Sequence, residues 1–390
     1  MKSTFLQYSL FVLFIATVVL VSVWSWVLID PNFTLVTHAD WTSFRALVIS
    51  LGYFQRQLSA SIYVSLILLL TAGSFLITKY YKGSVLPLLI VVGCIAGLLS
   101  YPALSHDLFN YIFDARILTH YHMNPYLHKA LDFPADPMLR FMHWVHRTYP
   151  YGPTYLLASL VPSALGLGIF ALTFLMFKAM HVVLFLIAGW MLSKLNRYAA
   201  LIFITSPLVI VEGLINTHND FVALSIAIIG IYLLHQKKNV SASFMFLFSG
   251  LIKYLSLPVL FLSAGETLQK TAKKTRSPIR KLADIPPWYF VALGIVGLLV
   301  YLVVHQEIQP WYFLNLFILL PFAPKLLEKC TLFFTGLLLS YYPYVLGGEW
   351  GQGGDVMVKR IIIFWALLLN ITVLLVAGIY RKLVTRSTFL

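Results

Sequence analysis

The chain contains long runs of residues without any Asp, Glu, Lys or Arg. Five of these runs are close to or longer than the ~20 residues that an α-helix needs to cross ~30 Å of hydrocarbon. Lipid offers no partner to backbone N–H and C=O groups, so a spanning segment must be a helix or part of a closed barrel. We therefore expect five transmembrane helices, at residues 3–29, 57–78, 83–106, 286–306 and 361–380.

The rest of the chain is similarly apolar. Of the 390 residues in the whole chain, 60% are hydrophobic and 11% are charged, whereas a soluble globular domain has ~25% charged residues. Single charges and prolines interrupt the middle of the chain, and no repeat of fixed period is present. These features predict one all-α domain over residues 1–390, a polytopic transmembrane helical bundle of about ten crossings plus a re-entrant pair.

The net charge of +14 is distributed unevenly among the segments between the spans. If the N-terminus is cytoplasmic, most Lys and Arg residues fall on the cytoplasmic side and most Asp and Glu residues on the outer side. This is the positive-inside pattern, and the excess positive charge would face anionic membrane lipids. It predicts a multi-pass protein of the cell membrane with cytoplasmic N- and C-termini, and it argues against nucleic acid as a partner.

Basic segments flank residues 240–264 on both sides. Both flanks are predicted to be cytoplasmic, and a single crossing cannot connect them. We expect a re-entrant pair of short helices that reverses at Gly250, Lys253 and Pro258, which brings Lys253 into the membrane interior. The next segment, 265–287, is predicted to be a basic cytoplasmic loop.

The largest polar segment covers residues 105–152 and is predicted to be an extracytoplasmic loop. A helix from Asp107 would place Asn110, Tyr111 and Asp114 on the same face as Asp107, which predicts an amphipathic helix lying on the membrane with a carboxylate stripe. The two carboxylates would be ~10.5 Å apart along the axis, too far to share a proton. Alternatively, Asp107 only caps the helix and Asp114 is a solvated side chain.

Six of the eleven histidines lie in this loop, and imidazole is the commonest transition-metal ligand. Their spacing, including the pairs His120/His122 and His143/His146, matches no closed metal site. Histidines at a membrane interface also bind headgroups or backbone. A divalent metal stays an alternative without support, and no cofactor is firmly implied.

Glu212 and Lys253 are ionisable residues in apolar segments, where each charge costs roughly 2.5–3.5 kcal/mol to insert. Such residues are functional candidates, although a structural ion pair explains them equally well. A phosphate-linked substrate would require a cation such as Lys253, Arg116 or Arg147. The Pro-Trp-Tyr turn at 310–312 is typical of an interfacial anchor.

Six short motifs occur in a fixed order between about residues 85 and 325. The motifs are Ser105-His106-Asp107-Leu-Phe-Asn-Tyr, Asn124-Pro125-Tyr126, Tyr151-Gly152-Pro153, His218-Asn219-Asp220, Gly250-Leu-Ile-Lys253-Tyr254 and Pro310-Trp311-Tyr312. This ordered set resembles the integral-membrane glycosyltransferases of the C-type fold that use polyprenyl-phosphate sugars, most closely the bacterial α-mannosyltransferases.

The resemblance implies a hexosyltransferase that moves a sugar, with mannose favoured, from a polyprenyl-phosphate donor to the hydroxyl of a glycan or lipid-linked acceptor on the outer face. It implies that Asp107 is the catalytic base, in a reaction that inverts the donor's anomeric carbon. The residues expected to bind substrate are His106, Tyr111, Asp114, Arg116, Asn124, Tyr151, Glu212, His218, Asn219, Asp220 and Lys253.

The sequence departs from the commonest C-type patterns because a single Asp follows His106, without an immediate second acid. Two alternatives stay open. A transporter or lipid flippase would use Glu212 and Lys253 as its translocation site, although the two halves of the chain show no obvious symmetry. A structural subunit of the cell envelope would use the loop only to bind a partner.

Overall fold

The computed structural model describes residues 2–80, 85–272, 284–349 and 353–387. Within these ranges the regular structure is helical, apart from an isolated bridge between Lys129 and Thr148. Among the described residues, five helices are long and apolar enough to cross a membrane, or six if one bent pair counts as a single span. The prediction of an all-α membrane bundle is confirmed. The five helices are α1 (Lys2–Trp24), α3 (Arg56–Tyr80), α7 (Phe170–Leu195), α13 (Trp288–His305) and α17 (Gly353–Ser387).

The predicted span at 83–106 is shorter than expected. Its helix, α4 (Leu86–Leu99), has 14 residues, which is about 21 Å of helix. The backbone becomes extended at Ser100, and the residue before Pro102 is sterically disfavoured in a helix. Four other apolar helices are similarly short, and the total of about ten crossings stays a prediction. They are α6 (Pro153–Leu165), α9 (Asn219–His235), α10 (Asn239–Ile252) and η7 (Pro310–Leu319).

The apolar segment 199–215 is broken in the middle. Helix α8 (Arg197–Thr205) and helix η5 (Val209–Ile215) are bent by 68° relative to each other. The break lies at Ser206 and Pro207, because proline lacks the N–H that would continue the helix and restricts the residue before it. The bend directs the end of η5, and the turn after it, into the protein interior.

The predicted reversal within 240–264 is present. Helix α10 ends at Ile252, and α11 (Leu260–Ala272) returns beside it after the short helix η6 (Tyr254–Val259). The Asn239 amide donates to the Glu266 carboxylate over 3.2 Å, so the start of α10 lies beside the later part of α11. The predicted loop 265–287 is helical up to Ala272, and its residues 273–283 lie outside the described residues.

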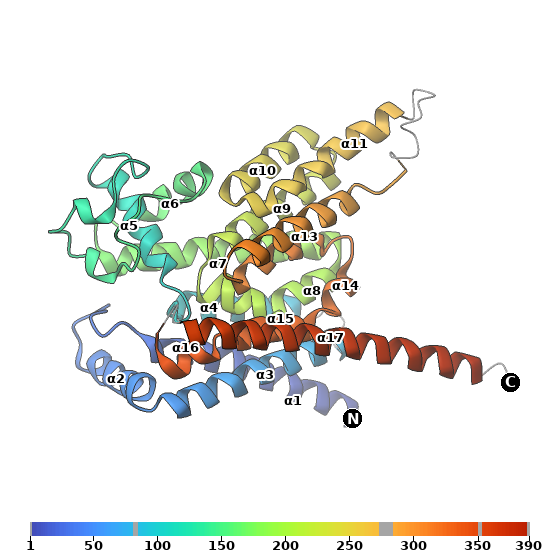
Figure 1. The fold of residues 1–390 in the computed structure, drawn as a ribbon, viewed down its shortest axis with the longest axis horizontal. Helices are drawn as coiled ribbons and strands as arrows, with labels where there is room; N and C mark the ends of the chain where they lie inside the picture. Colours follow the sequence, from blue (N-terminus) through green and yellow to red (C-terminus); the bar gives the residue numbers. More distant parts are fainter. Residues whose placement is uncertain (1, 81–84, 273–283, 350–352, 388–390) are drawn as a thin grey trace.

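The helices place the two ends of the chain together. The N-terminal end of α1 and the C-terminal end of α17 lie at the same end of the bundle, as does the end of α11, whereas α2, α5 and α6 lie at the opposite end (Figure 1). Completing the framework are η1 (Ser25–Leu28), α2 (Ala39–Ile49), η2 (Ser50–Phe54), α5 (Asp107–Thr119), η3 (Ala130–Asp132), η4 (Leu139–Phe141), α14 (Pro324–Glu328), α15 (Thr331–Leu339) and α16 (Tyr342–Gly347).

Candidate active site

Asp107 is the first residue of α5, at the end of the extended segment that follows α4. Its backbone N–H donates to the Ser105 hydroxyl over 3.2 Å, and the helix N-terminus favours a negative charge. The Asp107 side chain is 16% exposed and lines a cavity of about 360 Å³. Asp107 is therefore both held in place and accessible to a ligand.

His218 lies between two carboxylates. Its Nδ1 is 3.6 Å from Asp107 Oδ2, and its Nε2 is 3.2 Å from Glu212 Oε2. Burial opposes the charged imidazole, but the hydrogen bonds and charges of Asp107 and Glu212 outweigh it and raise the pKa of His218 to about 8. Burial likewise raises the pKa of Asp107, but His218, with Lys253 and Arg147, lowers it below its ordinary value. Asp107 is therefore ionised at neutral pH.

An aromatic ring fixes the orientation of His218. The Trp311 ring, on η7, stacks on the imidazole with centroids 3.9 Å apart and planes 19° apart. The turn at 310–312 has the composition of an interfacial anchor and is also one of the six ordered motifs, and Trp311 lies in the site. Its stacking on His218 could not be predicted, because the two residues are distant in the sequence.

Asp220 and Lys253 form a second pair. Lys253 Nζ is 2.9 Å from Asp220 Oδ2, and the Asn315 amide donates to Asp220 Oδ1 over 2.9 Å. The ammonium also lies over the rings of Tyr312 and Tyr151, 5.3 and 5.9 Å from their centroids. The break between α10 and η6 places Lys253 beside Asp220, as a cation that is paired and surrounded by aromatic rings. Its predicted position in the membrane interior stays a prediction.

Two buried side chains hold the turn between η5 and α9 in place. Lys178 Nζ, on α7, donates to the carbonyl oxygens of Leu214 and Ile215 over 2.6 and 2.9 Å. Asn216 accepts from the Leu104 N–H and donates to Glu212 Oε2 over 3.0 Å. Since these bonds join the segment before Asp107 to the segment that carries Glu212, they set the geometry of the Asp107–His218–Glu212 group.

The cavity beside Asp107 has two distinct walls. One comes from the polar loop and includes the stacked rings of His106 and His143, with centroids 3.8 Å apart. The other comes from the segment before and into η7. A volume of about 360 Å³ lies within the roughly 300–1,000 Å³ range of small-molecule sites. The lining residues are Leu104, Ser105, His106, Asp107, His143, Trp144, Glu307, Gln309 and Trp311.

The helix that begins at Asp107 is present, but its environment differs from the prediction. Asn110, Tyr111 and Asp114 are at most 6% exposed, so the expected surface helix with an exposed carboxylate stripe is wrong. Helices α6 and α7 pack against α5, and Phe141 from the loop covers it. Burial raises the pKa of Asp114 to about 7, so Asp114 is not the solvated side chain of the alternative interpretation.

The structure brings most of the predicted site residues together, but not all of them. Tyr111 contacts Asp107 Oδ2 and the Asn219 N–H through its hydroxyl, each over 3.5 Å. Arg116 is bound to the buried Asp136, with Nε 2.6 Å from Oδ2. It lines a different cavity of about 690 Å³ at the other end of α5. Asn124 lies in a turn, where its side chain accepts from the Tyr126 N–H.

We also looked for metal ligands among the residues that the structure describes. No group of three or more His, Cys, Asp or Glu side chains there could hold a metal ion.

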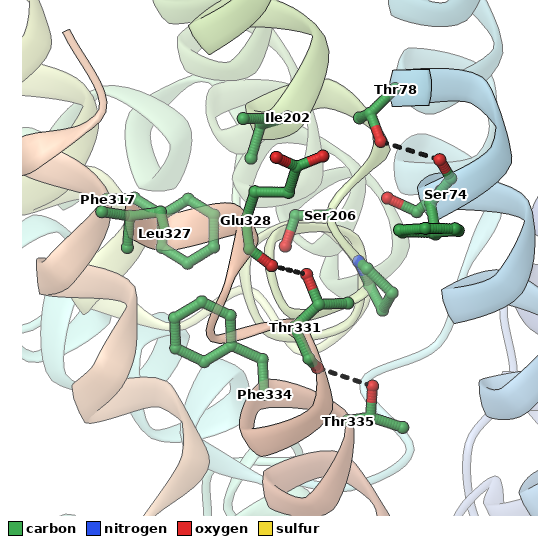
Figure 2. Close-up of a pocket in the computed structure, with 12 residues that line it drawn as sticks. Ser74, Thr78, Ile202, Ser206, Phe317, Leu327, Glu328, Thr331, Phe334 and Thr335 are labelled. Atoms are coloured by element: carbon green, nitrogen blue, oxygen red, sulfur yellow. Dashed lines mark hydrogen bonds between the residues drawn. The ribbon is translucent and has the colours of Figure 1, made fainter. Parts of the chain in front are cut away.

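Figure 2 shows another cavity, where α3, α8, α14 and α15 meet, lined by Ser74, Glu328 and Thr331 among others. Its volume of about 20 Å³ holds about one water molecule, so it is too small for a sugar.

Comparison with known protein families identifies the family of this chain. The family model described as alpha-(1->6)-mannopyranosyltransferase, N-terminal domain, matches residues 15–265, more than half of the chain. The chain belongs to this family. It is a membrane mannosyltransferase, and the predicted resemblance is confirmed. The same comparisons found no matching curated protein and no matching solved structure.

The mannosyltransferase match covers only part of the site. Asp107, Glu212, His218, Asp220 and Lys253 lie within residues 15–265. The second cavity wall and the partners Trp311 and Asn315 lie beyond it. The sequence analysis did not identify Asn216, Asn315 or Lys178 as part of this arrangement, because each acts through contacts between distant segments.

Proposed function

We propose that the protein transfers a mannosyl residue from polyprenyl-phosphate mannose to a hydroxyl of a glycan or lipid-linked acceptor, with Asp107 as the base. The observation that carries this proposal is an ionised carboxylate on the wall of a sugar-sized cavity, in a chain of the mannosyltransferase family. The reaction takes place at the extracytoplasmic face. It inverts the anomeric carbon, for which one base is sufficient.

Asp107 accepts a hydrogen bond from the acceptor hydroxyl and orients it. As the acceptor oxygen bonds to the anomeric carbon, the bond from that carbon to the phosphate oxygen breaks and the hydroxyl proton passes to Asp107. The hydroxyl becomes acidic only as the new bond forms, so a carboxylate of low pKa is an adequate base. Afterwards the low pKa favours release of that proton to water.

The leaving polyprenyl phosphate requires cations and no general acid. Lys253 is near enough to Asp107 to lower its pKa, and so is Arg147. Arg147 lies over the Trp144 ring, 4.9 Å from its centroid, and makes no ion pair with a carboxylate among the described residues. Lys253 and Arg147 would therefore bind the donor phosphate, whereas Arg116 lines a different cavity at the other end of α5.

The transporter alternative has less support. A translocation site would use Glu212 and Lys253 together, but Glu212 contacts His218 and Lys253 contacts Asp220. Glu212 and Lys253 thus belong to separate groups. Glu212 belongs to the group with His218 and Asp107, whereas Lys253 lies over the ring of Tyr151. The arrangement supports a fixed catalytic site around Asp107 more than a pathway across the membrane.

The test uses the full-length protein in lipid nanodiscs with radiolabelled polyprenyl-phosphate mannose and an α-(1→6)-linked mannotriose acceptor. We expect Asp107→Asn to reduce transfer by about 10²- to 10⁴-fold, the usual range for loss of a general base. The matched control is Asp40→Asn, because Asp40 is an exposed carboxylate on α2. An unchanged rate in Asp107→Asn would exclude Asp107 as the base. No transfer by the wild type, together with substrate counterflow in proteoliposomes, would favour the transporter.

A further inference from the structure

The cavity beside Asp107 has no Lys or Arg among its described lining residues, but it has two carboxylates, Asp107 and Glu307. The cations that influence Asp107, namely Lys253 and Arg147, do not line it. Each of these carboxylates is already paired with a cation, Asp107 with His218 and Glu307 with Lys359. The lining itself therefore supplies no cation to hold a phosphate, whereas its polar groups suit a neutral, hydroxyl-rich molecule. We call this cavity the neutral side of Asp107.

Lys359, on the last transmembrane helix, holds two side chains that line the neutral side. Its Nζ, on α17, donates to Glu307 Oε1 and to Gln309 Oε1, each over 2.8 Å. Lys359 is 4% exposed, so this contact is built into the protein interior. The segment between α13 and η7 is thereby tied to a helix that follows it by about fifty residues in the sequence.

This contact determines which groups face the cavity. An ammonium only donates hydrogen bonds, so the Gln309 amide must present its oxygen to Lys359, and its NH₂ is left to donate elsewhere. Glu307 uses Oε1 for Lys359 and keeps Oε2 as an acceptor. The wall therefore offers one donor and one acceptor beside the flat ring of Trp311, and Trp144 also lines the cavity. Paired hydroxyls on a pyranose ring match this pattern.

We infer that this cavity is the acceptor subsite, and that it binds the terminal neutral pyranose of the glycan through Glu307 and Gln309. Lys359 is a positioning residue that orients both side chains. The inference rests on the proposed transfer reaction, and it assigns a role to residues beyond the 15–265 region that matches the family. It places the acceptor hydroxyl next to Asp107.

The test measures the KM values for acceptor and donor separately, with α-(1→6)-linked mannotriose and polyprenyl-phosphate mannose. We expect Gln309→Ala to raise the acceptor KM about tenfold, the equivalent of about 1.4 kcal/mol, at an unchanged donor KM. Gln309→Glu should do the same, because it keeps an oxygen for Lys359 and removes the donor. The matched control is Gln306→Ala, since Gln306 is exposed and does not line the cavity.

Lys359→Met should also raise the acceptor KM, and Lys359→Arg should have an acceptor KM between those of Lys359→Met and the wild type. A thermal unfolding measurement identifies any variant that fails to fold, and Gln309→Glu then decides the question. A raised donor KM with an unchanged acceptor KM, or a Gln309→Glu variant that behaves like Gln306→Ala, would overturn the subsite while the transfer reaction stands. Absence of transfer by the wild type would instead overturn the proposed function, and the subsite with it.

Discussion

At the scale of single residues, the charge state of the site depends on His218. Its pKa of about 8 exceeds the ~6.5 of an unperturbed histidine. The stability that its protonation contributes is therefore complete below about pH 6.5 and is lost as the pH rises through 8. The imidazolium also provides the largest contributions that lower the pKa of Asp107, so one residue links stability and base strength.

Replacement of His218 should change the pH dependence of transfer in a defined direction. In His218→Gln the pKa of Asp107 rises, because the largest interaction that opposes the effect of burial is lost and only Lys253 and Arg147 still lower the pKa. Asp107 is then protonated at higher pH, so the acid limb of the kcat/KM profile moves to higher pH. The exposed His38, as His38→Gln, is the control. An acid limb that stays in place would contradict this role of His218.

At the scale of elements, breaks in helices build the site more than the helices themselves do. The bend between α8 and η5 delivers Glu212 and His218, and the break after α10 delivers Lys253. The start of α6 packs closely against this second break. A Cβ atom on Gly152 would lie 1.7 Å from the Leu251 carbonyl oxygen, so only glycine permits the approach.

Gly152→Ala should therefore damage both stability and activity. The clash is with backbone and no side chain can move away to relieve it, so α6 and α10 must separate and carry Tyr151 away from Lys253. We expect a lower unfolding temperature and at least about a tenfold loss of transfer, since small displacements at an active site are costly. Gly378→Ala is the control, because a Cβ at Gly378 meets no atom within 4 Å. Equal behaviour of the two variants would contradict the close-packing argument.

At the scale of the whole molecule, the helices separate a site end from an end that carries the termini. The N-terminal end of α1 and the C-terminal end of α17 lie at the same end of the bundle, and α5 and α6 lie at the opposite end (Figure 1). The basic segment around Lys237 and Lys238 follows α9, and acidic Asp107 lies at the other end of the bundle. This arrangement fits the proposed orientation, in which the loop faces outward and both termini are cytoplasmic.

Cysteine labelling in intact cells tests the orientation. In a chain with Cys94 and Cys330 replaced by Ala, the exposed Leu127 in the loop is changed to Cys. We expect Leu127→Cys to react with a membrane-impermeant maleimide in intact cells. Gln236→Cys, at the exposed end of α9, should react only after permeabilisation. The reverse pattern would invert the orientation and place the site on the cytoplasmic side.

The sequence alone determined the class of protein and the residues of greatest chemical interest. Charge-free runs indicate membrane helices because lipid excludes charges and unsatisfied backbone. Local motifs indicated Asp107, His218, Asp220 and Lys253, since these residues follow breaks that are visible as Gly, Pro and Asn in the sequence.

Only the tertiary structure decided which side chains meet. It buried α5 within the protein, bound Arg116 to Asp136, and brought Trp311 and Lys359 from distant helices to the site. The spacing of apolar residues in the sequence indicates that a helix has an apolar face. Whether its polar face is also buried depends on which segments pack against it. Contacts between residues far apart in the chain leave no local pattern, because each residue type is also common where it has no such partner.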